Sequence, residues 1–198
     1  MSAFRFTTAR RARPIEGLTA CGDAVIEVHA DNWHLFAVVD ALGHGPDAEK
    51  SAVLATKAAE ASKGQPLSVV FEAVHRALWG HRGVVMSALL VQGDEFTFAG
   101  VGNVELFSPA DVARPVAMAG TLGTQRYRFR SFQLPLRHGQ RWVLASDGIK
   151  ARDASTALAE LRAHDAEAAA DALLERVTRS NDDASVLVLD VHAPEARP

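Results

Sequence analysis

Four aspartates stand at the edges of apolar segments, where a buried carboxylate is costly unless something positive meets it. Asp40 and Asp147 each end an apolar run, whereas Asp23 and Asp182 each come just before one. Oppositely directed strands would place all four carboxylates on the same rim. Carboxylate oxygens are suitable ligands for hard cations such as Mg²⁺ and Mn²⁺. The pattern therefore predicts a divalent metal site.

Such a rim has a definite chemistry. Two metal ions that share one carboxylate, about 3.5–4 Å apart, can turn water into a nucleophile and stabilise a phosphoryl transition state. Asp40 is the best candidate for the shared ligand, and the tight turn after it could expose the Ala41 carbonyl to the same ion. Taken alone, Asp23 follows a glycine and is better explained as a turn residue. The four acids together favour the metal site.

The order of the expected elements indicates how these residues are positioned. Strands are expected at 24–28, 33–40, 84–91, 95–101, 104–107, 127–134, 141–146 and 184–191, and helices at 47–63, 67–79, 154–164 and 166–178. Strands and helices do not alternate as in a doubly wound fold, so the class is α+β. Several strands lack an apolar/polar alternation and are expected to be covered on both faces. Two stacked antiparallel sheets flanked by helices, a four-layer α-β-β-α sandwich, meet this requirement.

Composition excludes some classes of function. The chain has 198 residues, which suits one domain over 1–198 with a core of about 18–191 and short tails. The net charge of −3 gives no electrostatic support for nucleic-acid binding. No segment approaches the roughly 20 apolar residues of a membrane span. The single cysteine, Cys21, allows no intrachain disulfide and fits the cytoplasm.

The N-terminus carries a basic cluster made of Arg5, Arg10, Arg11 and Arg13. A solvated tail is the favoured interpretation, and a phosphate- or partner-binding role is the alternative.

Six short motifs occur in a fixed order along residues 18–191: "CGD", "VVDALGHG", "FAGVGN", "GTLGT", "LASDGI" and "NDDASVLVLD". With this ordered set the chain resembles the bacterial PP2C-like metal-dependent phosphatases of the SpoIIE/RsbU/RsbX group. It is most similar to the compact RsbX branch, because the chain is short and carries no sensor domain. The α-β-β-α sandwich of that family agrees with the layers expected above.

The resemblance implies roles for the matching positions. Two Mn²⁺ or Mg²⁺ ions are implied, with Asp40 as the bridging ligand and a backbone carbonyl supplied by residue 41. The implied metal ligands are Asp23, Asp40, Ala41, Asp147 and Asp182, and the neighbouring Asp183 is expected to be secondary.

Two positions depart from the family pattern. Many eukaryotic members have a phosphate-binding arginine shortly before the first acid, and residues 18–22 offer none. Some members have a histidine proton donor two residues after the bridging aspartate, where this chain has Leu42. His44, two residues further on, matches the bacterial "GHG" pattern and is a candidate catalytic residue that would donate a proton to the leaving seryl oxygen. A purely structural role in the turn is the alternative.

The resemblance implies a cytoplasmic serine/threonine phosphoprotein phosphatase that needs no membrane or nucleic acid. Its expected substrates are phosphorylated STAS-domain proteins, RsbR/RsbS-like, in a stressosome or partner-switching pathway. One rival is a binding module that kept the fold and lost turnover, and another is a metal phosphoesterase for small molecules. Partner recognition is expected from the long loop at 108–125, for which a tolerated surface insertion is the alternative.

Overall fold

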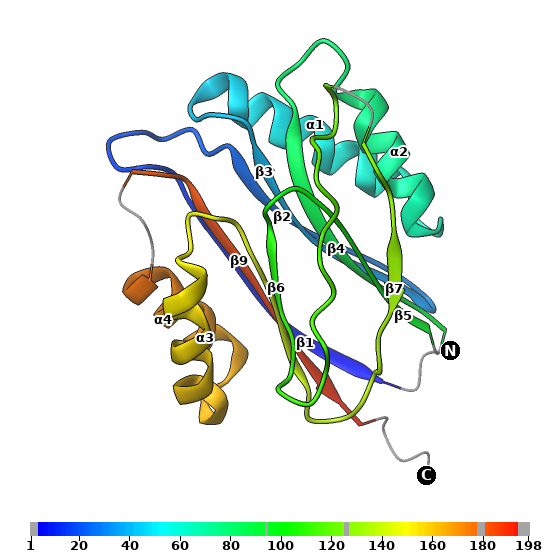
Figure 1. Cartoon of the computed structure of the whole chain (residues 1–198), viewed down its shortest axis with the longest axis vertical. Coiled ribbons are helices and arrows are strands. Elements are labelled where there is room, and N and C mark those ends of the chain that lie inside the picture. The colour runs from blue at the N-terminus through cyan, green and yellow to red at the C-terminus, as the bar shows by residue number, and fades with distance from the viewer. Residues whose placement is uncertain (1–3, 94, 125–126, 178–180, 194–198) are drawn as a thin grey trace.

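The computed structural model describes residues 4–93, 95–124, 127–177 and 181–193 (Figure 1). The elements follow the order expected from the sequence, with one additional strand at the N-terminus. They are β1 (Arg5–Arg13), β2 (Asp23–Ala30), β3 (Trp33–Ala41), α1 (Pro46–Ala61), α2 (Leu67–Ala77), β4 (Val84–Gln92), β5 (Glu95–Val101), β6 (Glu105–Phe107), β7 (Ser131–Gln133), β8 (Arg141–Ala145), α3 (Ala151–Glu160), the 3₁₀ turn η1 (Leu161–Ala163), α4 (Ala166–Val177) and β9 (Ala184–His192).

The strands form two sheets in which every neighbouring pair is antiparallel. One sheet has the order β1-β9-β8-β6 and the other β2-β3-β4-β5-β7. Figure 1 shows α1 and α2 over the five-stranded sheet, and α3 and α4 over the four-stranded sheet, with the two sheets facing each other. The α+β class and the α-β-β-α sandwich are confirmed.

Burial on both faces explains why several strands lack polar alternation. In β3, Leu35 and Val39 pack in the core shared with α1 and α2. The intervening Phe36 and Val38 pack in the core between the two sheets. A third core joins α3 and α4 to the four-stranded sheet. Successive side chains of a strand point to opposite faces, so a strand covered on both faces must be apolar throughout.

The strand registers bring the acidic positions to one end of the sandwich. Asp23 lies directly opposite Asp40 in the β2–β3 pair. In the other sheet Ala145 lies opposite Val186, so Asp147 follows β8 at the end where Asp182 precedes β9. A side chain at Gly148 would place its Cβ 1.9 Å from the Asp183 carbonyl oxygen. Only glycine lets these two segments run so close together.

The N-terminal basic cluster forms a strand, so the expectation of a solvated tail was wrong. All nine residues of β1 pair with β9. The Arg11 guanidinium binds the carboxylates of Glu167 and Asp171 on α4, and Arg10 pairs with Glu27 of β2. Without β1, the outer edge of β9 would expose unpaired backbone groups. These acids compensate the charges of Arg10 and Arg11, two of the arginines that made the segment resemble a tail.

Other elements differ from expectation mainly at their ends. The strand expected at 127–134 shortens to Ser131–Gln133, because only these residues pair with Thr97–Ala99 of β5. The helix expected at 154–164 begins earlier, at Ala151, and ends in η1. The antiparallel hairpin of β4 and β5 is confirmed. Its turn residue Asp94, the last residue of the helix expected at 166–178 and the end of the loop at Gln125 lie outside the described residues.

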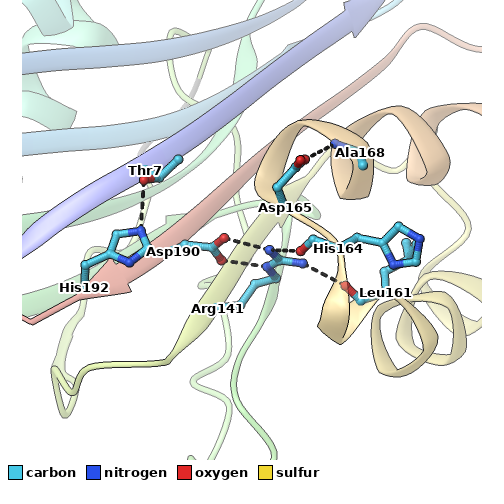
Figure 2. Close-up of polar contacts among 8 residues, drawn as sticks. All are labelled: Thr7, Arg141, Leu161, His164, Asp165, Ala168, Asp190 and His192. Atoms are coloured by element: carbon cyan, nitrogen blue, oxygen red, sulfur yellow. Dashed lines mark hydrogen bonds and ion pairs between the residues drawn. The ribbon is translucent and has the colours of Figure 1, made fainter.

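An arginine ties the helices to the four-stranded sheet at the end away from the acids. Figure 2 shows the Arg141 guanidinium between the Asp190 carboxylate and the chain that joins α3 to α4. Its Nε and Nη2 each lie 2.6 Å from an Asp190 oxygen, and it donates to the carbonyls of Leu161 and His164 at 2.9 and 2.8 Å. The charges of this pair are compensated within the chain.

Candidate metal centre

Asp23 is a nearly buried carboxylate at the start of β2. Asp23 is only 6% exposed. Its Oδ2 atom has no hydrogen-bond partner among the described residues. Burial raises the pKa of Asp23 to about 7, and the charges of Asp183 and Asp182 add to the rise. The hydroxyls of Ser146 and Ser185 offset part of this effect. A buried carboxylate oxygen without a donor is suited to receive a cation.

Asp40 lies opposite Asp23, at the end of β3, and is half-buried. Burial, together with the carboxylates of Asp23, Asp147, Asp182 and Asp183, raises the pKa of Asp40 to about 8. Acids from both sheets raise the pKa of this one carboxyl, so they lie within electrostatic range of it. Their mutual repulsion opposes the charged state of the rim.

Asp147 and Asp182 contribute from the four-stranded sheet, and both are partly exposed. Asn103 orients Asp147 by donating from Nδ2 to the Asp147 Oδ2 at 2.7 Å. The backbone N–H of Asp183 donates to Asp182 Oδ1 at 3.0 Å. Asn103 is the last residue of the "FAGVGN" motif. The sequence analysis identified this motif, but the sequence does not show that Asn103 contacts Asp147.

Asp183 differs from the other acids because both of its oxygens accept backbone hydrogen bonds. Oδ1 accepts from the N–H of Ile15 and Oδ2 from the N–H of Gly22, each at 2.7 Å. The residue is 3% exposed. Asp183 therefore holds the segment that leads into Asp23, which agrees with the secondary role expected for it.

Ala41 and His44 lie in the connection between β3 and α1. Ala41 is buried, and its N–H donates to the Gly22 carbonyl at 3.0 Å. His44 is exposed, and its ring makes no hydrogen bond or ion pair with any described residue. The proposed carbonyl ligand is thus fixed by the fold, whereas the histidine ring is not held by a partner.

Two serines missed by the sequence reasoning support the acids. Ser185 donates its backbone N–H to the Ser146 hydroxyl at 2.9 Å, which joins the two segments beside Asp23. Both serines are buried. They lie within the motifs "LASDGI" and "NDDASVLVLD", but nothing in those motifs shows that their side chains face Asp23.

The rim is open rather than a closed cage. Across the described ranges, no three histidine, cysteine, aspartate or glutamate side chains lie close enough together to hold a metal ion ready-made. Spacing of this kind is expected of like charges, which repel one another more strongly as they approach. The donor set contains only oxygens, and the Asp23 Oδ2 lacks a donor. These features fit Mg²⁺ or Mn²⁺ better than a softer ion.

A sizeable cavity lies away from the rim. It has a volume of about 1000 Å³ and is formed around Arg141 and Asp190, with residues 107–111 and part of α3 as walls. None of the four rim aspartates lines it. The chemistry of the rim, rather than cavity size, identifies the candidate site. No helix among the described residues is long and apolar enough to cross a membrane.

Comparisons with known proteins identify the family of the chain. The family described as Stage II sporulation protein E (SpoIIE) matches residues 30–192. Phosphoserine phosphatase RsbX of Bacillus subtilis (strain 168) is 26% identical over 143 residues, which cover 70% of this chain and 72% of RsbX.

Two solved structures share the fold. A structure described as "The bacterial stressosome: a modular system that has been adapted to control secondary messenger signaling" has a TM-score of 0.86 and 29% identity, and the match covers 93% of this chain and 99% of that one. A crystal structure of RsbX in complex with magnesium has a TM-score of 0.81 and 21% identity, covering 94% and 95% of the two chains.

Proposed function

The chain belongs to the SpoIIE family of PP2C-like serine/threonine phosphatases, and we propose that it dephosphorylates STAS-domain stress regulators with the help of two divalent metal ions. The observation that carries the proposal is the meeting of Asp23 and Asp40 with Asp147 and Asp182 at one rim. Four carboxylates at one place are costly unless cations compensate them.

The choice of substrate draws on the relatives. RsbX of Bacillus subtilis is named as a phosphoserine phosphatase, and a structure with 29% identity is described in terms of the bacterial stressosome. RsbX has also been crystallised with magnesium. These likenesses support phosphorylated RsbR/RsbS-like STAS proteins as substrates and Mg²⁺ or Mn²⁺ as the ions.

The residues of the rim would divide the work as follows. Asp40 would bridge the two ions, with Asp23, Asp147, Asp182 and the Ala41 carbonyl as the remaining protein ligands. Divalent ions bound in this way activate water and neutralise charge on a phosphoryl group. Asn103 keeps the Asp147 carboxylate oriented, and Asp183 fixes the approach to Asp23.

Hydrolysis needs a proton for the leaving group. Water supplies the new oxygen on phosphorus, the bond to the seryl oxygen breaks, and that oxygen must be protonated as it leaves. His44 stands four residues after Asp40 on an exposed turn, and no described contact occupies its ring. We assign His44 as the donor of this proton.

Two other functions compete with this one. A binding module without turnover is consistent with the absence of an arginine from residues 18–22, whereas the complete set of rim acids favours an enzyme. A phosphoesterase for small molecules would use the same rim. Comparing hydrolysis of a phosphoprotein with that of a small aryl phosphate distinguishes the three.

The decisive assay uses purified protein and a phosphorylated STAS-domain protein of the RsbR/RsbS type. Treatment with chelator should abolish release of phosphate, and Mn²⁺ or Mg²⁺ should restore it. Full activity in chelator would rule out the metal mechanism. Turnover of p-nitrophenyl phosphate without any turnover of phosphoproteins would favour the small-molecule enzyme, and no turnover of either would favour the binding module.

A further inference from the structure

An unusual set of exposed side chains lies beside the rim. Trp79 follows α2 and is 71% exposed, whereas the other two tryptophans, Trp33 and Trp142, are buried. Leu42, two residues after Asp40, is 47% exposed. Exposed large apolar side chains beside a functional site mark interaction surfaces, and tryptophan is enriched among the residues that dominate binding.

The turn that carries Trp79 is attached directly to the loop that follows Asp40. The N–H of Leu42 donates to the Gly83 carbonyl at 2.9 Å, and Arg82 Nη1 donates to the Leu42 carbonyl at 3.3 Å. Gly43 has φ +81°, and a Cβ there would lie 2.5 Å from Arg82 Nη1. The Arg82 guanidinium therefore lies over the bare backbone of Gly43, three residues from Asp40.

The same turn is held from its other side. Val84 and Leu122 exchange two backbone hydrogen bonds of 3.0 and 2.8 Å, and the N–H of Gly123 donates to His75 Nδ1 at 3.0 Å. The rings of His75 and Trp79 meet edge to face, with centroids 6.1 Å apart. The "GTLGT" segment thus supports the turn. A surface held on both sides loses little conformational freedom when a partner binds.

Arg82 has only weak internal partners. Its Nη2 lies 3.5 Å from Asp47 Oδ2, and the side chains of Arg82 and Asp47 are 42% and 77% exposed. An exposed ion pair of this kind contributes little to stability. The guanidinium can therefore exchange Asp47 for an anionic group on a partner at low cost. Arginine is also suited to bidentate binding of carboxylate or phosphate.

We propose that Leu42, Trp79 and Arg82 form the docking surface for the folded phosphoprotein substrate. Trp79 and Leu42 pack on apolar surface next to the phosphorylated residue, and Arg82 pairs with an acidic group there. The proposal rests on the proposed function, because it names the surface by which the same rim selects a protein substrate. It assigns docking to the turn after α2 rather than to the loop at 108–125.

The test compares three substrates of increasing simplicity. They are a phosphorylated STAS-domain protein of the RsbR/RsbS type, a short peptide carrying its phosphorylated residue, and p-nitrophenyl phosphate. Trp79→Ala and Arg82→Ala should each lower kcat/KM for the phosphoprotein by about tenfold, mainly through KM, as truncation of a binding hot spot does. Turnover of the peptide and the aryl phosphate should stay within about twofold of wild type.

Matched controls come from exposed residues of the same kinds far from the rim. Val69 is 43% exposed in the first turn of α2, and the side chain of Arg137 is 63% exposed at the opposite end of the sandwich. Val69→Ala and Arg137→Ala should leave kcat/KM for all three substrates unchanged.

Binding is measured independently by fluorescence in chelator. Since Trp79 is the exposed tryptophan, the phosphoprotein should shift its emission to shorter wavelength in wild type but not in Trp79→Ala. Equal phosphoprotein kinetics in wild type and both variants, or an equal loss on all three substrates, would overturn the docking proposal and leave the phosphatase assignment intact. A wild-type protein that fails to act on the phosphoprotein at all would overturn the proposed substrate and docking together.

Discussion

Charged side chains are compensated at one end of β8 and β9 but not at the other. At one end Arg141 and Asp190, with side chains 17% and 18% exposed, form a bidentate pair, and the remaining donors of Arg141 reach two carbonyls. At the other end four carboxylates from both sheets gather, and their repulsion contributes to raising the pKa of Asp40. The first arrangement is complete within the chain, whereas the second gains stability when a cation is added from outside. The half-buried pair of Arg141 and Asp190 is thus structural, whereas the uncompensated carboxylates are the candidate functional site.

The largest effect is expected when single acids are removed from the rim. Asp40→Asn should lower kcat on p-nitrophenyl phosphate by roughly a thousandfold or more, because a shared ligand affects both ions. Asp183→Asn should retain much more activity but lower the free energy of unfolding by about 2 kcal/mol, since an amide nitrogen cannot accept one of its two backbone hydrogen bonds. Kinetics and thermal melts of both folded variants check this. Equal losses of activity would contradict the ranking.

The pH dependence of stability tests the rim without any substrate. Asp23 and Asp40 have pKa values raised to about 7 and about 8 in the folded protein, against about 3.9 in an unfolded chain. A raised carboxyl pKa stabilises the fold fully below the unfolded pKa, and this contribution is lost as pH rises through the folded pKa. In chelator, the free energy of unfolding should therefore fall steadily between pH 4 and pH 8, with each unit of raised pKa corresponding to about 1.4 kcal/mol.

Denaturant titrations at several pH values measure this slope, and Asp40→Asn should flatten it. Addition of Mg²⁺ at pH 8 should recover stability, because the ion favours the charged carboxylates. A slope unchanged by Asp40→Asn would show that other groups produce it.

The opposite end is tested by breaking its pair. Arg141→Ala should cost about 2 kcal/mol of unfolding free energy, because Asp190 and two carbonyls lose a charged donor. Turnover of p-nitrophenyl phosphate should be unchanged, since this end lies roughly 20 Å from Asp147 by strand geometry. Arg137→Ala is the matched control: its exposed pair with Asp111 should be worth less than about 0.5 kcal/mol. A large loss of activity in folded Arg141→Ala would break the division between the two ends.

The smallest effect is expected from the loop. Residues 109–111 and Arg114 line the cavity at the Arg141 end, whereas Met118 pairs with the backbone of Gly100 and Gly102 near the rim. Shortening 109–117 with Met118 kept should change phosphoprotein turnover by no more than about threefold. If shortening the loop lowered phosphoprotein turnover selectively and by more than Trp79→Ala does, the loop would be the main recognition element.

Much of the fold followed from apolar patterning, because strands covered on both faces have an unmistakable composition. β1 was not predicted because its sequence is dominated by Arg5, Arg10, Arg11 and Arg13. Its pairing with β9 and its contacts with acidic residues join segments that are distant in the sequence. The strand at 127–134 was overestimated because alternation alone does not show how far β5 extends to pair with it.

The acids of the site were visible because their position at strand ends is a local feature. The orientation of Asp147 by Asn103, the hydroxyls that face Asp23 and the covering of Gly43 by Arg82 each join separate elements. No local pattern records such contacts, although Asn103, Ser146 and Ser185 all lie in motifs that the sequence displays. The roles of the site residues remain predictions that the variants above test.

The pairing of β1 with β9 has a consequence for synthesis of the protein. β1 leaves the ribosome well before β9, its pairing partner in the sheet, and must wait for it, because β9 lies between β1 and β8. Contacts so distant along the chain slow folding and leave strand edges exposed meanwhile. Asp182 arrives with the segment that leads into β9. The four carboxylates therefore come together only after the segment that leads into β9 has been made, so a nascent chain that stops before Asp182 carries an incomplete rim.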